Sequence, residues 1–248
     1  MEPRDWRSLK LGDNLGYTTA VIWVPKLIVI FVFVAVSVII FDFDGTLADT
    51  LEAIVAITNR LAQEFGYKTF NSEEVKKLQN LSSQEIIKYS QIPILKLPFL
   101  VRRVKNELKQ EIPYLKPIDG IQEALLALKQ EGNQLGIVTS NAESNVLTFL
   151  KHHGLYELFD FVHSGTSLFG KNKVLKRLLA QKRIALDTVV YVGDETRDIE
   201  AAKQVKIKSI AVSWGFNSRQ ALARQNPDFL IGQPQELLAI AQSLRVSK

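Results

Sequence analysis

Cysteine is missing from the sequence, and histidine occurs only three times among 248 residues. Without cysteine the chain has no disulfide, no thiolate metal site and no cysteine nucleophile. Three histidines leave little material for a zinc site, so a metal bound by this chain would be held by oxygen ligands. Internal repeats and low-complexity segments are missing as well, and 46% of the residues are hydrophobic. These features predict one large folded domain, or a core domain that carries a smaller one.

A strong charge of one sign is also lacking, because 31 Lys and Arg stand against 26 Asp and Glu. The net charge of +5 is compatible with nucleic acid, anionic lipid or an anionic substrate as partner. Residues 66–117 hold ten of the cations and five of the acids, which accounts for the whole excess. We expect Arg102, Arg103 and Lys105 in this segment to attract an anionic small molecule, and we expect no nucleic-acid partner. The alternative is that these cations form a solvated helix face.

A continuous apolar segment long enough to span a membrane is lacking too. Leu27–Phe41 is apolar except for one serine, but Pro25 separates it from the apolar residues before it, and a spanning helix needs about 20 such residues. The last part, residues 36–43, is typical of a strand that is buried on both faces. We therefore expect residues 1–35 to be a hydrophobic extension of a cytoplasmic protein. Membrane attachment through residues 20–41 is the alternative, and the oligomeric state is left open.

Helical spacing of apolar residues runs without a strand signal from residue 50 to residue 112. From Ile118 onward, predicted strands alternate with predicted helices, a pattern typical of a parallel sheet with helices on both faces. We predict strands 135–139, 161–164, 188–192 and 208–212, and helices 121–130, 143–152, 172–181, 198–204 and 234–244. The fold class is therefore α/β, a doubly wound parallel sheet with a small all-helical cap. The predicted domains are the extension 1–35, the core 36–48 with 113–248, and the cap 49–112.

Polar side chains follow three of the predicted strands at the point where each strand ends. Ligands of a doubly wound sheet bind beyond the carboxyl ends of its strands, so we expect these side chains to lie on one rim. Several are carboxylates, which repel one another unless a cation joins them, and an all-oxygen site suits Mg²⁺. Taken alone, such acids are also common in turns and at the starts of helices. The residues are Asp42 and Asp44 after the first strand, Thr139, Ser140 and Asn141 after the second, and Asp194 and Asp198 after a later one.

These residues belong to four ordered motifs that resemble those of the haloacid dehalogenase superfamily. The similarity runs from about residue 36 to residue 231. The first and fourth motifs are the specific ones, while the third is a single lysine. Within the superfamily, the run Gly193–Ala202 is most similar to phosphoglycolate phosphatase-like members. The motifs are Asp42-Phe43-Asp44-Gly45-Thr46-Leu47, Ile137-Val138-Thr139-Ser140-Asn141, Lys171, and Gly193-Asp194-Glu195-Thr196-Arg197-Asp198.

The resemblance implies a phosphoryl transfer in two steps. Asp42 would attack the phosphorus atom and form an aspartyl phosphate. Asp44 would protonate the leaving oxygen and would then act as general base for water. Thr139 would hydrogen-bond the phosphoryl oxygens, helped by Ser140 and Asn141 at the start of the next helix.

The resemblance also implies how the charge of the phosphoryl group would be neutralised. Lys171 would offset the negative charge of Asp42 and of the phosphoryl oxygens. Mg²⁺ would be bound by Asp42, by the backbone carbonyl of Asp44 and by Asp194, while Asp198 would contact water on the metal.

We therefore expect a Mg²⁺-dependent phosphatase that acts on a small phosphorylated metabolite, with phosphoglycolate as the first candidate. A cap inserted after the first motif would close over small molecules but not over folded proteins. A phosphomutase or a pyrophosphatase of the same superfamily stays open, because the same aspartyl phosphate serves each of them. A membrane-tethered protein that keeps the fold only for binding is the alternative from a different class.

Overall fold

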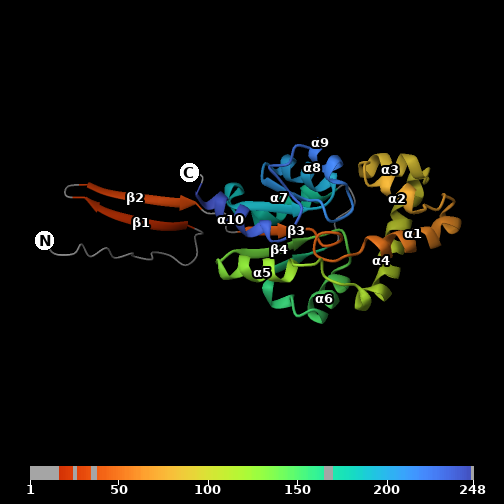
Figure 1. Cartoon of the computed structure of the whole chain (residues 1–248), viewed down its shortest axis with the longest axis horizontal. Coiled ribbons are helices and arrows are strands. Elements are labelled where there is room, and N and C mark those ends of the chain that lie inside the picture. Colours follow the sequence, from red (N-terminus) through yellow and green to blue (C-terminus); the bar gives the residue numbers. More distant parts are fainter. Residues whose placement is uncertain (1–16, 25–26, 35–37, 165–169, 247–248) are drawn as a thin grey trace.

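A six-stranded parallel sheet forms the core of the computed structural model, which describes residues 17–24, 27–34, 38–164 and 170–246. The strand order is β5-β4-β3-β6-β7-β8, so β3, which precedes Asp42, lies in the middle of the sheet (Figure 1). This order confirms the predicted doubly wound α/β fold. The strands are β3 (Val38–Phe41), β4 (Gln134–Val138), β5 (Phe161–His163), β6 (Val189–Gly193), β7 (Lys208–Val212) and β8 (Phe229–Ile231).

Helices cover both faces of this sheet, which explains why the central strand is apolar at every position. Ile39 and Phe41 pack in one hydrophobic cluster with residues of α5, α6 and α10, whereas Val38 and Ile40 pack in another with residues of α7 and α8. Successive side chains of a strand point to opposite faces, so each face of β3 has its own core. The core helices are α5 (Ile121–Gln130), α6 (Glu143–His152), α7 (Lys171–Gln181), α8 (Thr196–Val205), α9 (Arg219–Arg224) and α10 (Glu236–Val246).

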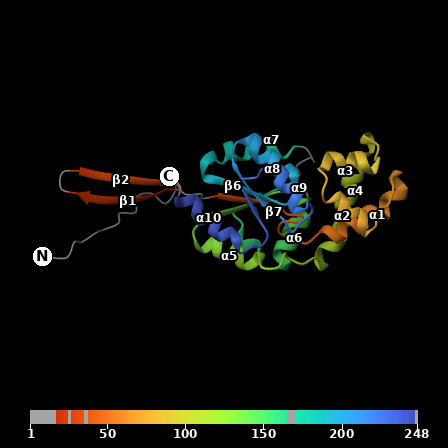
Figure 2. The same ribbon diagram turned by 45° about the horizontal axis from the view of Figure 1, so that its top comes forward.

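Four helices between β3 and α5 form a separate group at one end of the core, here called the cap (Leu51–Glu111; Figure 2). Asn71 and Ser82 each begin a cap helix with a capping box, in which side chain and backbone satisfy each other's hydrogen bonds. The first and last helices pack together and bury apolar residues that include Leu61 and Leu108. The cap helices are α1 (Leu51–Phe65), α2 (Ser72–Leu78), α3 (Ser83–Ser90) and α4 (Leu97–Glu111), with the short 3₁₀ helix η1 (Ile94–Lys96) before α4.

The chain crosses between core and cap twice, and the two crossings are hydrogen-bonded to each other. The Asp49 N–H donates to the Lys116 carbonyl at 3.0 Å, and the Ile118 N–H donates to the Leu47 carbonyl at 3.0 Å. Because both crossings lie side by side, the cap is joined to the core at one narrow place. Three further 3₁₀ helices lie in the connections, η2 (Ile112–Tyr114), η3 (Tyr156–Leu158) and η4 (Leu186–Thr188).

An antiparallel pair of strands precedes the core, β1 (Tyr17–Val24) and β2 (Leu27–Val34), with Tyr17 opposite Val34. Figures 1 and 2 both show this pair extending from the end of the core opposite the cap. The sequence predicted no secondary structure here, and residues 1–16, 25–26 and 35–37 of the extension lie outside the described residues. No helix of the described residues combines the length and the apolar character needed to cross a membrane. The extension and its membrane attachment through residues 20–41 stay predictions.

Candidate active site

Asp42 follows the last residue of β3 and is held in line with the neighbouring strand. Its N–H donates to the Val192 carbonyl at 2.9 Å, and its Oδ1 accepts from the Phe43 N–H at 2.8 Å. Gly45 then turns the chain with φ of +71°, a conformation that other residues rarely adopt. A Cβ on Gly45 would lie 2.3 Å from Asp194 Oδ2, so only glycine lets this loop approach the carboxylate.

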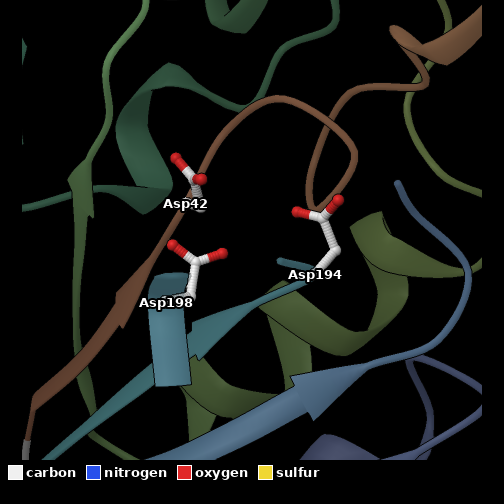
Figure 3. A group of neighbouring side chains, drawn as sticks. All are labelled: Asp42, Asp194 and Asp198. Atoms are coloured by element: carbon white, nitrogen blue, oxygen red, sulfur yellow. The ribbon is translucent and has the colours of Figure 1, made fainter. Parts of the chain in front are cut away.

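Three buried carboxylates converge beside this loop, as Figure 3 shows. Asp42, Asp194 and Asp198 each offer an oxygen, and these oxygens lie within 4.8 Å of one another. Burial and the neighbouring acids raise the pKa of Asp194 well above its usual range and raise the pKa of Asp198 to about 6. Both shifts express the cost of holding crowded negative charge away from water. The sequence predicted that these side chains would share one rim, and the structure brings them together.

Asp194 is fixed in one orientation by the residues around it. Thr46 Oγ1 donates to its Oδ1 at 2.7 Å, and the Phe216 N–H donates to its Oδ2 at 2.7 Å. A Cβ on Gly215 would lie 2.3 Å from the same Oδ2. Two glycines therefore leave room for the carboxylate, and two donors orient it.

Lys171 lies between two of the three acids and is only 3% exposed. Its Nζ donates to Asp42 Oδ2 at 2.6 Å and to Asp198 Oδ1 at 2.5 Å. Burial lowers the pKa of Lys171, but the Asp198 and Asp42 charges outweigh burial and raise it, so the side chain stays an ammonium. Phosphate contact by Lys171 stays a prediction, and its contact with Asp42 is a feature of the structure.

The residues of this site suit a divalent cation. The three clustered acids and Glu195 make four carboxylates, and Lys171 and Arg197 are the two cations that pair with members of this group. Fully ionised, the group carries two uncompensated negative charges, which one divalent cation would neutralise. The donors are all oxygens, as Mg²⁺ prefers.

Asp44 lies apart from the three acids, at the wall of a pocket. Asn141 Nδ2 donates to its two carboxylate oxygens at 2.9 and 3.1 Å. Burial and the Asp42 charge raise the pKa of Asp44 to about 7. A carboxyl group that is partly protonated near neutral pH can donate a proton to a leaving oxygen.

Besides Lys171, three residues were predicted to bind phosphate, and they occupy different surroundings. Thr139 is buried, and its Oγ1 accepts from the Asn141 N–H at 3.0 Å. Asn141 uses its side-chain oxygen to accept from Asn145 Nδ2 at 3.0 Å, so its amide is oriented toward Asp44. Ser140 lines the pocket, and its side chain has no hydrogen-bond partner among the described residues. Phosphate binding by Thr139, Ser140 and Asn141 stays a prediction.

The pocket lies between core and cap and has a volume of about 270 Å³. Pockets for drug-sized ligands are larger, at roughly 300–1,000 Å³. The core contributes polar residues, among them Asp44 and Arg197, whereas the cap contributes mainly apolar ones. The apolar cap residues are Ile54, Ile86, Ile87, Ile92, Leu97, Leu100, Val101, Val104 and Leu108.

Asn217 links the cap to the fourth motif, a role that no sequence pattern indicated. Its Oδ1 accepts from the Thr196 N–H at 2.9 Å, while its Nδ2 donates to the carbonyls of Gln79 at 3.1 Å and Leu81 at 2.9 Å. A second tie joins α4 to the core, because Asn145 Nδ2 donates to the Lys105 carbonyl at 3.1 Å. Both ties depend on how the cap docks, so no local sequence pattern predicts them.

Two further residues of the site were overlooked although the sequence carries a signal for each. Thr46 belongs to the first motif, and its hydroxyl reaches Asp194. Arg197 lies within the fourth motif, where a long cation between two acids indicates a local ion pair.

Comparison with known proteins extends these observations. The family model of the haloacid dehalogenase-like hydrolases matches residues 39–212. The phosphoglycolate phosphatase of Synechococcus elongatus is 40% identical over 208 residues, which cover 84% of this chain and 98% of that protein. The pyrophosphatase PpaX of Listeria innocua is 28% identical over 215 residues, with 84% and 97% covered. A solved structure of a predicted phosphatase from Clostridium acetobutylicum has a TM-score of 0.73 at 22% identity and covers 84% of this chain and 99% of that one, which supports the fold alone.

Proposed function

The chain belongs to the haloacid dehalogenase-like hydrolase family, and within this family we propose that it is a Mg²⁺-dependent phosphatase of a small phosphate monoester. The observation that carries the proposal is the buried contact between Lys171 and Asp42, 2.6 Å long, beside two more carboxylates. Phosphoglycolate is the first candidate substrate, because the relative that is 40% identical is named a phosphoglycolate phosphatase.

In this proposal Asp42 is the nucleophile. One carboxylate oxygen attacks the phosphorus atom, the bond from phosphorus to the ester oxygen breaks, and an aspartyl phosphate forms. Lys171 supports this role because its ammonium lies against Asp42 Oδ2, where it offsets the repulsion between a carboxylate and a phosphate dianion. A bound Mg²⁺ would be held by Asp42, Asp194 and the Asp44 carbonyl, with Asp198 in contact with a water on the metal, and would supply further neutralisation of the phosphoryl charge.

Asp44 is the general acid and base of the proposed reaction. Its protonated carboxyl donates a proton to the departing ester oxygen, and the resulting carboxylate then takes a proton from the water that attacks the aspartyl phosphate. Two features support the assignment, the pKa raised to about 7 by burial and the Asn141 amide that holds the carboxyl group.

The size and lining of the pocket favour a small substrate. The pocket is lined by Asp44, and its volume of about 270 Å³ leaves room for a short leaving group beside this carboxyl group. Mutase chemistry would need a second phosphorylated sugar to enter the same space. Pyrophosphate is the second candidate, favoured by the 28% identity to a pyrophosphatase over most of both chains.

The test is phosphate release from phosphoglycolate and pyrophosphate, with and without Mg²⁺, by the parent protein and by Asp42→Asn. We expect Mg²⁺-dependent release by the parent and a loss of at least about 10⁴-fold in the variant, because loss of a nucleophile removes the covalent route.

Asp49→Asn serves as the matched control, because Asp49 is an exposed acid seven residues along the same loop. It should keep the parent's rate within about threefold, as most surface substitutions do. Equal rates for Asp42→Asn and the parent would disprove the mechanism.

A further inference from the structure

Lys105 stands out among the residues of the pocket because it is a cation on an otherwise apolar wall. It belongs to α4, is half-buried, and lines the pocket together with Val101, Val104 and Leu108 of the same helix. These four positions share one helix face, since side chains three and four residues apart are neighbours. A lysine on this face brings a positive charge to the wall of the pocket.

The ammonium of Lys105 has no partner among the residues that the structure describes. Within these described ranges, its Nζ takes part in no ion pair and no hydrogen bond. Burial lowers the pKa of Lys105, and the nearby Asp44 charge offsets this only in part. A charged group that loses water without gaining a partner costs free energy, which an anionic ligand would recover.

Arg197, the other cation that the structure places in the lining of this pocket, is already paired, and so is Lys171 of the acid cluster. Lys171 contacts Asp42 and Asp198, and Arg197 contacts Glu195. Lys105 is therefore the cation that differs from them, since its charge is balanced by no acid in hydrogen-bond contact within the described part of the chain.

Lys105 does not lie with the residues proposed to act on the phosphoryl group. Lys105 lines the same pocket as Asp44, the proposed acid for the leaving oxygen, whereas none of the three clustered acids lines it. Lys171 lies at the other end, against Asp42. An anion bound by Lys105 would thus belong to the leaving group.

We propose that Lys105 binds a carboxylate on the leaving group, so that the enzyme selects phosphate esters of short hydroxy acids over esters of neutral alcohols. The inference rests on the proposed phosphatase function. One unpaired ammonium matches the single negative charge of a carboxylate. The phosphate released from pyrophosphate carries more charge than one lysine balances.

The experiment compares phosphoglycolate with its amide, phosphoglycolamide, which has nearly the same shape but no carboxylate charge. For the parent we expect the acid to be preferred at least about tenfold in kcat/KM. Lys105→Met should lower kcat/KM for the acid by about ten- to a hundredfold, the range for loss of a charge-assisted hydrogen bond. The loss should fall mainly on KM, and the amide should change by less than about threefold.

Two further variants test whether the effect comes from direct contact between Lys105 and the carboxylate or from the positive charge of the helix in general. Arg102→Met removes a cation from the exposed face of the same helix and should leave the preference for the acid unchanged. Lys105→Arg keeps the charge and should retain most of the preference. If Lys105→Met does not give a thermal unfolding midpoint near that of the parent, Lys105→Gln replaces it.

Each outcome bears on the proposal in a distinct way. Equal losses on acid and amide, or no loss on either, would overturn the role of Lys105 while leaving the phosphatase function intact. A larger loss on pyrophosphate than on phosphoglycolate would overturn the carboxylate assignment. Failure of the parent to release phosphate from all three compounds would overturn the proposed hydrolysis of phosphoglycolate, on which the role of Lys105 rests.

Discussion

On the core side of the site charged side chains are buried and paired. On the cap side most residues that line the pocket are apolar, and one cation has no partner among the described residues. Asp194 is oriented by Thr46 and Phe216, and Lys171 joins two acids. The cap side offers Lys105 and a set of aliphatic side chains. The core side is thus arranged before any ligand binds, while the cap side is completed by the ligand.

The two sides also differ in how firmly they are held. The core acids follow central strands of a sheet that is covered by helices on both faces. The cap is tied to the core by a small set of hydrogen bonds, among them those of Asn217, Asn145, Ser218 and Arg224. This difference suggests that the core sets whether the reaction proceeds and the cap sets which ester reacts. The following substitutions test that division, in order of expected effect.

Asp194→Asn should cause the largest loss, because it removes a proposed Mg²⁺ ligand from the core. Metal ions stabilise phosphoryl transfer by several kcal/mol, so kcat should fall by about 10⁴-fold even at high Mg²⁺. In the absence of Mg²⁺ the variant should unfold at a higher temperature than the parent, since burial and the neighbouring acids disfavour the charged form of Asp194.

Steady-state kinetics and thermal melts check both halves of this prediction. Asp119→Asn, an exposed acid on the core surface, should change neither quantity. A variant that keeps the parent's rate and Mg²⁺ dependence would remove Asp194 from the metal site.

Asp44→Asn should cause the next largest loss, about 10³-fold on phosphoglycolate, because general acid catalysis contributes roughly 10²–10⁴-fold. The effect should depend on the leaving group. p-Nitrophenol leaves without a proton, so with p-nitrophenyl phosphate the rate of aspartyl phosphate formation should fall by less than about tenfold. Burst kinetics measure this step directly. An equal loss with both esters would contradict the assignment of Asp44 as acid.

Asn217→Ala should lower kcat/KM by about thirtyfold, because two hydrogen bonds to the cap are lost at about 1 kcal/mol each. The core loses one more hydrogen bond, to the Thr196 N–H. Asn217→Asp separates the two functions of the side chain. It keeps an acceptor for the Thr196 N–H but cannot donate to the Gln79 and Leu81 carbonyls.

If Asn217 acts by docking the cap, Asn217→Asp should lower kcat/KM as much as Asn217→Ala does. Limited proteolysis should then cut both variants faster than the parent within residues 112–118. Recovery of parent activity by Asn217→Asp would instead assign Asn217 to support of α8.

Combined replacement of Arg102 and Arg103 by Gln should have the smallest effect. Arg103 contacts Glu107 and lies near Glu64 on the exposed side of the cap, while Arg102 is exposed. Exposed ion pairs contribute little, so the unfolding midpoint should move by less than about 3 °C. kcat/KM should fall by less than about threefold, and only at low salt. A larger loss would show that steering by the whole basic face, not contact by Lys105, selects the substrate.

The sequence predicted the sheet well because its signals are local. A continuous apolar strand before Asp42, and glycines after the helices, mark β3 and the elements that follow. The short β8 (Phe229–Ile231) and α9 (Arg219–Arg224) were not predicted, since three and six residues are too few for a clear period. The pairing of β1 with β2 was missed as well, because an apolar run without alternation does not distinguish strand from extension.

For the site, the sequence predicted which acids would meet but not how they are supported. Asp42, Asp194 and Asp198 follow strand ends, and a parallel sheet brings such ends together. The contact of Asn141 with Asp44 could not be foreseen, because the same amide suits a phosphate equally well. Lys105 was noticed only as part of a basic helix, although its place within the apolar stripe of α4 is a readable signal.

The paired crossings at Asp49–Lys116 and Leu47–Ile118 have a consequence for how this architecture can be rebuilt. Since the chain leaves and returns at adjacent points, the closure of the core does not depend on what lies between them, and longer insertions cost little extra chain entropy. The helical segment is therefore an exchangeable module. Grafting a different cap between residues 49 and 116 should change the substrate selectivity while the catalytic residues of the core stay the same.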